Sequence, residues 1–350
     1  MIYTQEALCF DDILLVPQRS YVESRHSINT AMIIGSGKRA IFLSLPVIAA
    51  PMDTVCDVEM CIAMAKAGGL GILHRYMSHE DQIAKTLLLK NYGFGFGVAI
   101  ASNNGFLDHA QRLYDNGATM MLVDTANGHG KYAIDAVAAL RNKFDDIHIM
   151  AGNVATADGF ARLSNAGADS VRVGIGGGAA CTTRMVSGHG IPTLASIIEC
   201  DKWLETFGSS GIDTCSIIAD GGIRNSGDMV KSFAAGAHAV MIGSMLAGTD
   251  ESPGNIFINE QGQHVKVFRG MASREAQKDA TGNVSVAEGI STTLPYKGIV
   301  RHILDEIRGG LGSGCSYSGC HNLYELSSFA KYVKVSSASL NESRPHAAHQ

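Results

Sequence analysis

The sequence lacks the features that would mark a membrane-bound, secreted or nucleic-acid-binding protein. No apolar run in its 350 residues reaches the length of a transmembrane span. The N-terminal residues show no basic region followed by an apolar stretch, so we expect no signal peptide. The net charge of −5 is mild and there is no long basic cluster, which disfavours nucleic acid or an anionic membrane as the main partner.

The cysteines lack any pairing pattern. None of the 8 belongs to a Cys-x-x-Cys pair, and together with the 13 histidines they form no recognisable zinc-binding spacing. A chain of this size does not need disulfides, and without a signal peptide we expect a reducing, cytoplasmic location. Most of these cysteines are therefore expected to be small buried apolar residues, as Cys61 is within Met60–Met64.

Short apolar runs rich in β-branched residues alternate with amphipathic stretches over much of the chain. Apolar residues make up 46% of the sequence and charged residues 17%, which is typical of a globular protein with a large core. Eight such runs predict a (β/α)₈ TIM barrel, with a doubly wound parallel sheet as the alternative. The expected strands are 47–50, 69–73, 95–100, 119–123, 147–151, 170–173, 216–219 and 239–242, and the expected helices include 57–67, 132–144, 157–166 and 227–235.

Polar residues and glycines follow most of the expected strands. In a barrel these positions gather at the C-terminal face, where barrel enzymes carry their active sites. A single aspartate at a strand end is often only a helix N-cap, so the repetition around the barrel is what predicts a shared site. The residues concerned are Met52, Asp53, His74, Ser102, Asp124, Gly152, Asn153, the loop 174–181, Asp220, Gly221, Gly222, Gly243 and Ser244.

The pattern changes after about Gly248. Residues 249–291 are polar and weakly periodic, which predicts a long functional loop or flap. Residues 298–309 are typical of a helix that ends at a glycine. We expect a single catalytic barrel domain over residues 1–350, with the flap at about 249–291 and a C-terminal tail at about 335–350.

A glycine-rich turn at 174–180 delivers Cys181 directly after one of the expected strands. Glycines allow a backbone to approach a ligand closely, and a thiolate on such a partly exposed loop can act as a nucleophile. Residues 174–179 also match the GxGxxA dinucleotide fingerprint. That motif should be followed by a long helix, but the segment Ser187–Pro192, with its glycines and proline, would interrupt a helix soon after the turn. This disfavours a Rossmann domain.

Two further glycine loops follow the last two expected strands, at 220–226 and 241–248. In barrels, the loops after strands seven and eight bind phosphate through backbone N–H groups near a helix N-terminus. Glycines at strand ends are also common turn formers. The presence of both loops favours a phosphate site, with Asp220 either accepting hydrogen bonds from ribose hydroxyls or serving as a cap.

Seven ordered motifs resemble those of the IMP dehydrogenase/GMP reductase family, and the resemblance covers nearly the whole chain. The motifs are Phe10–Pro17, Ala50–Val55, Ala151–Val154, Gly176–Arg184, Ala219–Gly222, Arg269–Met271 and Leu294–Gly298. The resemblance implies a (β/α)₈ barrel, usually a homotetramer, that acts on a purine mononucleotide. Its cysteine would attack C2 of the purine, and hydride would move between C2 and a nicotinamide.

The resemblance also implies roles for individual residues. Cys181 would be the nucleophile, with Thr183 and Glu288 as further catalytic residues. The nicotinamide cofactor would contact Ser102, Asp124, Asn127 and Gly128, and the carbonyls of Gly176, Gly178 and Cys181 would hold a monovalent cation such as K⁺. The nucleotide would contact Met52, Asn153, Asp220, Gly221, Gly222, Gly243, Ser244, Gly270, Met271 and Gly289, with Asp220 at the ribose and Gly222, Gly243 and Ser244 at the phosphate.

Three features resemble the reductase branch of the family. The dehydrogenase activates water with an Arg-Tyr pair on its flap, whereas residues 272–287 contain neither that pair nor any tyrosine. Asn127 stands where dehydrogenases carry histidine. Regulatory CBS domains, inserted after the second strand in most dehydrogenases, are absent.

Other features resemble the dehydrogenase branch or neither branch. Gly68–His74 and Ser336–His346 are closer to dehydrogenases. Gly177 and Ala179 replace a proline and a phosphate-contacting serine, and Ser285 replaces an arginine usual in reductases.

The resulting hypothesis is a cytoplasmic GMP reductase that uses NADPH to convert GMP to IMP and ammonia. The first alternative is an IMP dehydrogenase without CBS domains, which would use NAD⁺ and water to make XMP. The second is a non-catalytic purine nucleotide-binding regulator. The retained Cys181, Thr183, Asp220 and Glu288 argue against the regulator, because a binding module has no need of a thiol.

Overall fold

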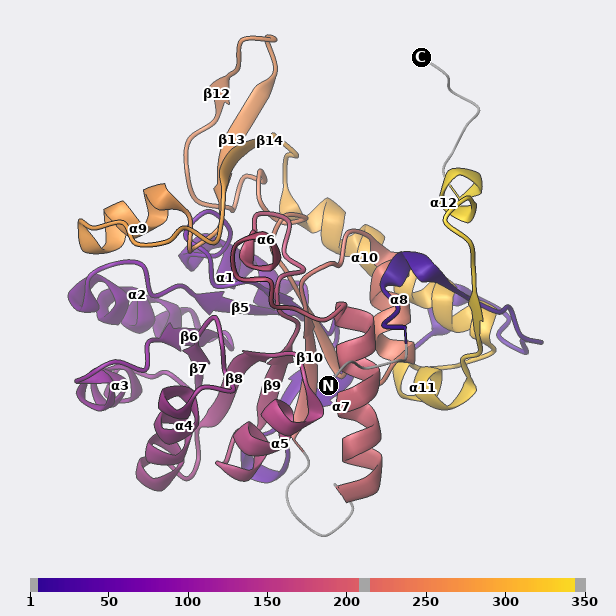
Figure 1. The fold of residues 1–350 in the computed structure, drawn as a ribbon, viewed down its shortest axis with the longest axis horizontal. Helices are drawn as coiled ribbons and strands as arrows, with labels where there is room; N and C mark the ends of the chain where they lie inside the picture. The colour runs from indigo at the N-terminus through magenta and orange to yellow at the C-terminus, as the bar shows by residue number, and fades with distance from the viewer. Residues whose placement is uncertain (1–5, 208–214, 344–350) are drawn as a thin grey trace.

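A closed barrel of eight parallel strands forms the centre of the computed structural model, which describes residues 6–207 and 215–343 (Figure 1). Around the barrel the order is β10-β11-β4-β5-β6-β7-β8-β9. This confirms the predicted (β/α)₈ fold. The strands are β4 (Val47–Ala49), β5 (Leu70–Leu73), β6 (Gly97–Ile100), β7 (Met120–Asp124), β8 (His148–Val154), β9 (Ser170–Val173), β10 (Ser216–Asp220) and β11 (Ala239–Ile242).

Helices follow the barrel strands and cover their outer faces (Figure 1). Side chains such as Val98, Val123 and Phe160 lie in the core between strands and helices, whereas Ile48 and Met150 belong to a separate core inside the barrel. The helices are α1 (Val58–Lys66), α2 (His79–Tyr92), α3 (Phe106–Asp115), α4 (Lys131–Lys143), α5 (Ala157–Asn165), α6 (Thr183–Ser187), α7 (Thr193–Phe207) and α8 (Ser226–Ala234).

The N-terminal end of the barrel is closed by a hairpin of β2 (Met32–Ile34) and β3 (Ile41–Leu43). Ile34 and Leu43 join the apolar cluster inside the barrel. The Gly35 N–H donates to Ser216 Oγ at the start of β10 (2.9 Å). With this end closed, access to the barrel interior is from the C-terminal face.

The flap is more ordered than the predicted long loop. It forms an antiparallel sheet of β12 (Phe257–Ile258), β13 (His264–Arg269) and β14 (Ser291–Pro295), which projects from the barrel beside α9 (Arg274–Thr281) (Figure 1). β13 is hard to recognise in the sequence because Lys266, a charged residue, occupies a buried position and interrupts the alternation of apolar and polar residues that is typical of a strand. The Lys266 ammonium donates to the carbonyls of Thr249 and Ser252, at 2.9 and 2.5 Å.

The helix predicted at 298–309 is α10 (Val300–Ser318), so the prediction that it ends at Gly309 was wrong. The glycines beyond Gly309 serve close packing. A Cβ at Gly310 would lie 2.2 Å from Ser226 Oγ, and one at Gly314 would lie 2.4 Å from Val230 Cγ2, so α10 can approach α8 only without these side chains. The helix ends at Gly319, whose φ is +75°.

The two ends of the chain meet. β1 (Ile13–Leu15), which follows the 3₁₀ turn η1 (Phe10–Asp12), pairs with β15 (Tyr332–Lys334). The 3₁₀ turn η4 (Leu323–Glu325) and α11 (Leu326–Phe329) precede β15, and the predicted tail contains α12 (Ser339–Glu342) before it passes outside the described residues at 344. The 3₁₀ turns η2 (Arg25–Ser27) and η3 (Gly37–Arg39) flank β2.

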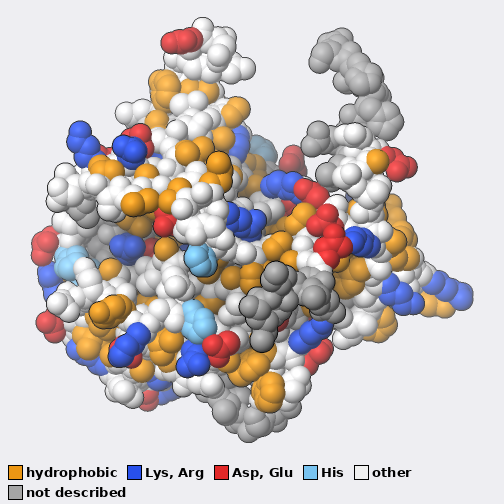
Figure 2. Space-filling model, viewed as in Figure 1, with side chains coloured by type: hydrophobic (Ala, Val, Ile, Leu, Met, Phe, Trp, Pro, Cys, Tyr) orange, Lys and Arg blue, Asp and Glu red, His pale blue; other side chains and the backbone are white. Residues whose placement is uncertain are grey.

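The described surface carries no marked patch of one charge on the face drawn in Figure 2, where acidic and basic side chains are interspersed. In the part of the chain that the structure describes, none of the helices combines the length and the apolar character needed to cross a bilayer.

Candidate active site

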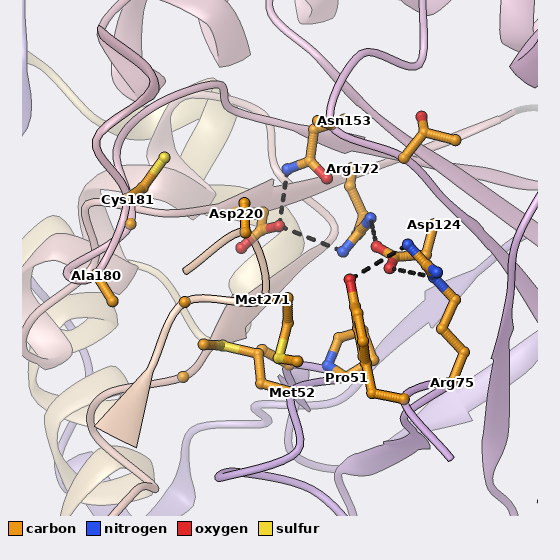
Figure 3. Close-up of a pocket in the computed structure, with 18 of the residues that line it drawn as sticks. Pro51, Met52, Arg75, Asp124, Asn153, Arg172, Ala180, Cys181, Asp220 and Met271 are labelled. Carbon is orange, nitrogen blue, oxygen red and sulfur yellow. Dashed lines mark hydrogen bonds and ion pairs between the residues drawn. The ribbon is translucent and has the colours of Figure 1, made fainter. Parts of the chain in front are cut away.

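A cavity of about 1030 Å³ opens at the C-terminal face of the barrel. Residues at the C-terminal ends of all eight barrel strands, or in the loops that follow them, contribute to its lining, and the flap contributes Gly270, Met271 and Glu288. Figure 3 shows Cys181 on one side and the Asp220, Arg172 and Asp124 side chains on the other, with Met271 and Met52 below Asp220 in this view. Most of the predicted strand-end residues therefore line this cavity, whereas Asp53, His74, Ser102 and Gly152 do not.

The cysteine loop packs directly on the loop that follows β10. Gly174 has a φ of +143°, and a Cβ there would lie 1.9 Å from the Asp220 carbonyl oxygen. At Gly177 a Cβ would lie 3.0 Å from Thr193 Oγ1 and 3.2 Å from the Gly221 carbonyl carbon. Position 174 therefore accepts only glycine. The absence of a side chain lets the cysteine loop pack closely against the Asp220–Gly222 turn.

Cys181 begins a chain of two hydrogen bonds that ends on a flap carboxylate. The Cys181 thiol donates to Thr183 Oγ1 (3.2 Å), and the Thr183 hydroxyl donates to Glu288 Oε2 (2.7 Å). All three side chains are partly buried and line the cavity. This chain can carry a proton away from the thiol, which is what a thiolate nucleophile needs.

The flap holds the cysteine loop through backbone hydrogen bonds. The Thr182 N–H donates to the Glu288 carbonyl (2.9 Å), and the Ile290 N–H donates to the Ala180 carbonyl (3.0 Å). Between these bonds, Cys181 and Gly289 form an antiparallel bridge. Gly289 therefore backs the cysteine loop and does not line the cavity, because its Cβ position faces the Ala180 carbonyl at 3.1 Å.

Arg269 fixes the flap to the barrel. Its guanidinium binds Asp53 after β4 through Nε (3.1 Å) and Nη2 (2.5 Å), and Asp279 of α9 through Nη1 (2.7 Å). The Asp53 N–H also lies 3.4 Å from Met271 Sδ. The residues on both sides of Met271 are thus tied to the barrel, which keeps that side chain over the cavity.

Two carboxylates stand opposite the cysteine at the ends of β7 and β10. Asn153 Nδ2 donates to Asp220 Oδ2 (2.8 Å), and burial raises the pKa of Asp220, although Arg172 and Asn153 oppose the rise. Burial would also raise the pKa of Asp124, but Arg172 and Arg75 outweigh it and hold that pKa below its usual value. Asp124 is therefore ionised at neutral pH.

Sequence reasoning missed Arg172, Arg75 and Tyr76, all of which line the cavity. The signal for Arg172 was available, since a lone cation inside the apolar run Ser170–Val173 is costly to bury without a partner. Arg75 and Tyr76 follow β5 after His74, close to the position where the other strands carry site residues. The Arg75 Nη2 donates to Tyr76 Oη (3.2 Å), and burial raises the pKa of Tyr76 to about 12.

The glycine cradle lies at the expected place after β10 and β11. Gly221 and Gly222 adopt φ values of +87° and +80°, and both line the cavity together with Gly243 and Ser244. The Ser244 carbonyl accepts a hydrogen bond from Lys297 Nζ (2.6 Å), which orders the turn from outside. Backbone turns of this kind can present N–H groups to an anion.

Three predicted cofactor contacts do not reach the cavity in the described structure. Ser102, Asn127 and Gly128 do not line it, whereas Asp124 does. Gly128 packs against β8, where a Cβ would lie 2.9 Å from Gly152 Cα. The Gly128 N–H donates to the Asn153 carbonyl (2.7 Å). Its role in this structure is to support Asn153 from behind.

The three carbonyls predicted to bind a cation lie on the cysteine loop, next to a guanidinium. The Gly178 carbonyl accepts the Cys181 N–H (3.0 Å). Arg184 packs against Gly176, where a Cβ would lie 2.5 Å from its Cγ, and donates to the carbonyls of Ile175 (3.1 Å) and Ile191 (2.8 Å). Arg184 thereby fastens the two ends of the loop together.

Comparisons with known proteins agree with this geometry. Residues 7–346 match the IMP dehydrogenase / GMP reductase domain. The inosine-5′-monophosphate dehydrogenase of Borreliella burgdorferi is 33% identical, and the match covers 98% of this chain and 97% of that protein. The GMP reductase of Leishmania major is 30% identical over 97% of each chain.

A solved structure is similar throughout. It is a cysteine-to-alanine variant of GMP reductase from Trypanosoma brucei in complex with guanosine 5′-monophosphate. The TM-score is 0.90 at 28% identity, and the match covers 98% of each chain.

Proposed function

This chain belongs to the IMP dehydrogenase/GMP reductase family, and from that premise we propose that it is a GMP reductase. The proposed reaction converts GMP and NADPH to IMP, ammonia and NADP⁺. The observation that carries the proposal is the Cys181–Thr183–Glu288 chain beneath a flap that has no tyrosine in residues 272–287. A proton relay is present, whereas the water-activating pair of the dehydrogenase is not.

Cys181 carries out the covalent step. Its thiol proton passes to Thr183, which is hydrogen-bonded to the Glu288 carboxylate, and the thiolate adds to C2 of the purine. Thr183 and Glu288 then supply a proton to the 2-amino group, which leaves as ammonia and leaves C2 bonded to sulfur. After C2 has accepted hydride, the C–S bond breaks and the thiolate of Cys181 returns.

The nucleotide lies between the cysteine loop and the turn after β10. The Asp220 carboxylate accepts hydrogen bonds from the ribose hydroxyls, and Asn153 fixes its orientation (2.8 Å). The phosphate lies against Gly222, Gly243 and Ser244, with Gly221 in the same turn. Met52, Gly270 and Met271 contact the base from the flap side.

The cavity has room for a nicotinamide beside the nucleotide. Its volume of about 1030 Å³ is at the upper end of the range for single-ligand sites, and ionised Asp124 lies on the wall shared with Arg75 and Tyr76. A reduced nicotinamide would supply the hydride that C2 accepts. Asp124 is the cofactor contact that the geometry supports, and NADPH is the proposed form.

Three further properties belong to the same proposal. The carbonyls of Gly176, Gly178 and Cys181 are hard oxygen donors of the kind that bind a monovalent cation such as K⁺, although no step above depends on one. We propose a homotetramer, as the family resemblance implies. We propose a cytoplasmic location, since the cysteines of the described residues are all free.

One assay separates this function from the alternative. Purified protein receives either GMP with NADPH or IMP with NAD⁺, and the absorbance of reduced nicotinamide and the release of ammonia are followed. Oxidation of NADPH with one ammonia per turnover supports the reductase. Reduction of NAD⁺ with IMP, and no reaction with GMP, would establish the dehydrogenase. The variant Cys181→Ala serves as the control, and full activity in it would overturn either chemistry.

A further inference from the structure

Arg172 joins the two carboxylates of the cavity wall. From β9 its Nη2 donates to Asp124 Oδ1 at the end of β7 (2.5 Å), while its Nη1 lies 3.7 Å from Asp220 Oδ2 at the end of β10. Arg75 completes the group from the other side of Asp124, with Nε 3.0 Å from Oδ2. Figure 3 shows the guanidinium of Arg172 between the two aspartates.

The arrangement balances charge but not hydrogen bonds. Two guanidinium groups face two carboxylates, and the Arg172 side chain is only 5% exposed. The Arg172 Nε nevertheless has no hydrogen-bond partner within the described residues. Such buried ionic groups are poor stabilisers, because desolvation offsets most of their attraction. An arginine held here with one donor unused therefore points to a role in the site.

Removing the cation would affect the two carboxylates unequally. Asp124 would keep Arg75 as its partner. Asp220 would keep only the Asn153 amide, and Asp124 faces it as a like charge. Among the groups packed around it on β7, β8 and β9, Arg172 is the one cation that acts on Asp220 in the described structure.

We propose that Arg172 is a positioning residue that keeps Asp220 ionised and oriented as the acceptor of the substrate ribose hydroxyls, at a fixed place relative to Asp124. This inference rests on the proposed function only in assigning the ribose to Asp220. Because both branches of the family act on a purine mononucleotide, it applies equally to GMP and to IMP. A protonated Asp220 would lose acceptor capacity and carry an O–H donor instead, so nucleotide binding should weaken as the pH falls through its titration.

The test compares three variants, each made in the Cys181→Ala background so that no covalent adduct forms, by the pH dependence of nucleotide binding, measured by calorimetry with GMP and with IMP. Arg172→Gln removes the charge, and Arg172→Lys keeps it without the planar fork. Arg141→Gln is the matched control, because it breaks a largely buried arginine–aspartate contact to Asp169 (2.5 Å), which lies just before β9 at the opposite end of the barrel. Thermal unfolding of each variant identifies any that fail to fold.

We expect Arg172→Gln to weaken nucleotide binding at neutral pH by on the order of 100-fold. It should also move the acid limb of the binding curve, which is the pH range over which affinity is lost on acidification, to higher pH. Arg172→Lys should bind more weakly than wild type but keep the limb in place. The titration of the nucleotide phosphate itself, near pH 6, is common to all variants and cancels in the comparison. An unchanged limb in Arg172→Gln, with a loss no larger than in Arg141→Gln, would overturn the proposal. Because binding is measured without turnover, this result does not depend on which reaction the enzyme performs.

Discussion

Replacing Gly270 with alanine tests whether the flap sets the position of Cys181. The backbone of Gly270 is not in the left-handed region, so alanine adds only a Cβ. That Cβ would lie 2.8 Å from the Ala180 carbonyl oxygen and 3.4 Å from Gly289 Cα. Ordinary contact begins near 3.4 Å, so the neighbouring carbonyl must move by about 0.6 Å.

The displaced carbonyl belongs to the residue before Cys181 and is the acceptor of the Ile290 N–H. A misplacement of about 1 Å at a reacting group costs on the order of 100-fold in rate, so we expect kcat of Gly270→Ala to fall by on the order of tenfold. Overpacking should also lower the free energy of unfolding by about 1–3 kcal/mol. Steady-state kinetics, chemical denaturation and the rate of Cys181 alkylation by iodoacetamide measure these effects.

Gly309→Ala is the matched control. A Cβ at Gly309 meets nothing within 4 Å, and the residue lies inside α10. Alanine there should leave kcat unchanged and raise the free energy of unfolding by up to about 1 kcal/mol. Equal kcat and equal alkylation rates in Gly270→Ala, Gly309→Ala and wild type would refute the idea that the flap positions the thiol.

Three further outcomes follow from individual contacts. Thr183→Val breaks the link from Cys181 to Glu288 and should lower kcat by about 10²–10³-fold with little change in the affinity for IMP by calorimetry; an unchanged kcat would rule out the relay. Gly314→Ala, whose Cβ would meet Val230 at 2.4 Å, should lower the free energy of unfolding by about 1–3 kcal/mol in urea, and an unchanged midpoint would contradict the packing role of that glycine. Burial lowers the pKa of His238 from 6.5 to about 4, so the unfolded state binds this proton first, and stability that is full above pH 6.5 is lost as the pH falls towards 4. Between pH 6.5 and 4, the free energy of unfolding of His238→Asn should fall by roughly 2 kcal/mol less than that of wild type. A pH dependence identical to wild type would show that this ring is not the source of the loss.

The barrel could be predicted from the sequence because buried parallel strands are continuous apolar runs. The structure places β9 and β11 at the predicted residues 170–173 and 239–242, and the other six barrel strands overlap their predicted ranges. The end of α10 could not be predicted, since a glycine that ends a helix and one that admits a neighbouring helix have the same local sequence. The difference depends on Ser226 and Val230 of α8, which lie about 80 residues away.

Site residues that follow a strand could be predicted one by one from the sequence. Residues that act through a partner from a different strand could not. Cys181, Asp220 and Glu288 all line the cavity. Arg172 was missed because its partners, Asp124 and Asp220, come from strands about 50 residues away on either side. The position of Gly128 behind Asn153 likewise depends on the register of β7 against β8, in which Asp124 pairs with Gly152.

The central claim is that Cys181 displaces the 2-amino group of GMP before any hydride arrives. Incubating the enzyme with GMP and no nicotinamide, quenching in acid and mapping the peptides by mass spectrometry tests this directly. The account predicts a purine nucleotide bonded to the Cys181 peptide and one ammonia released per adduct, with both suppressed in Thr183→Val. An unmodified Cys181 after GMP, together with labelling of the same peptide by IMP plus NAD⁺, would contradict it.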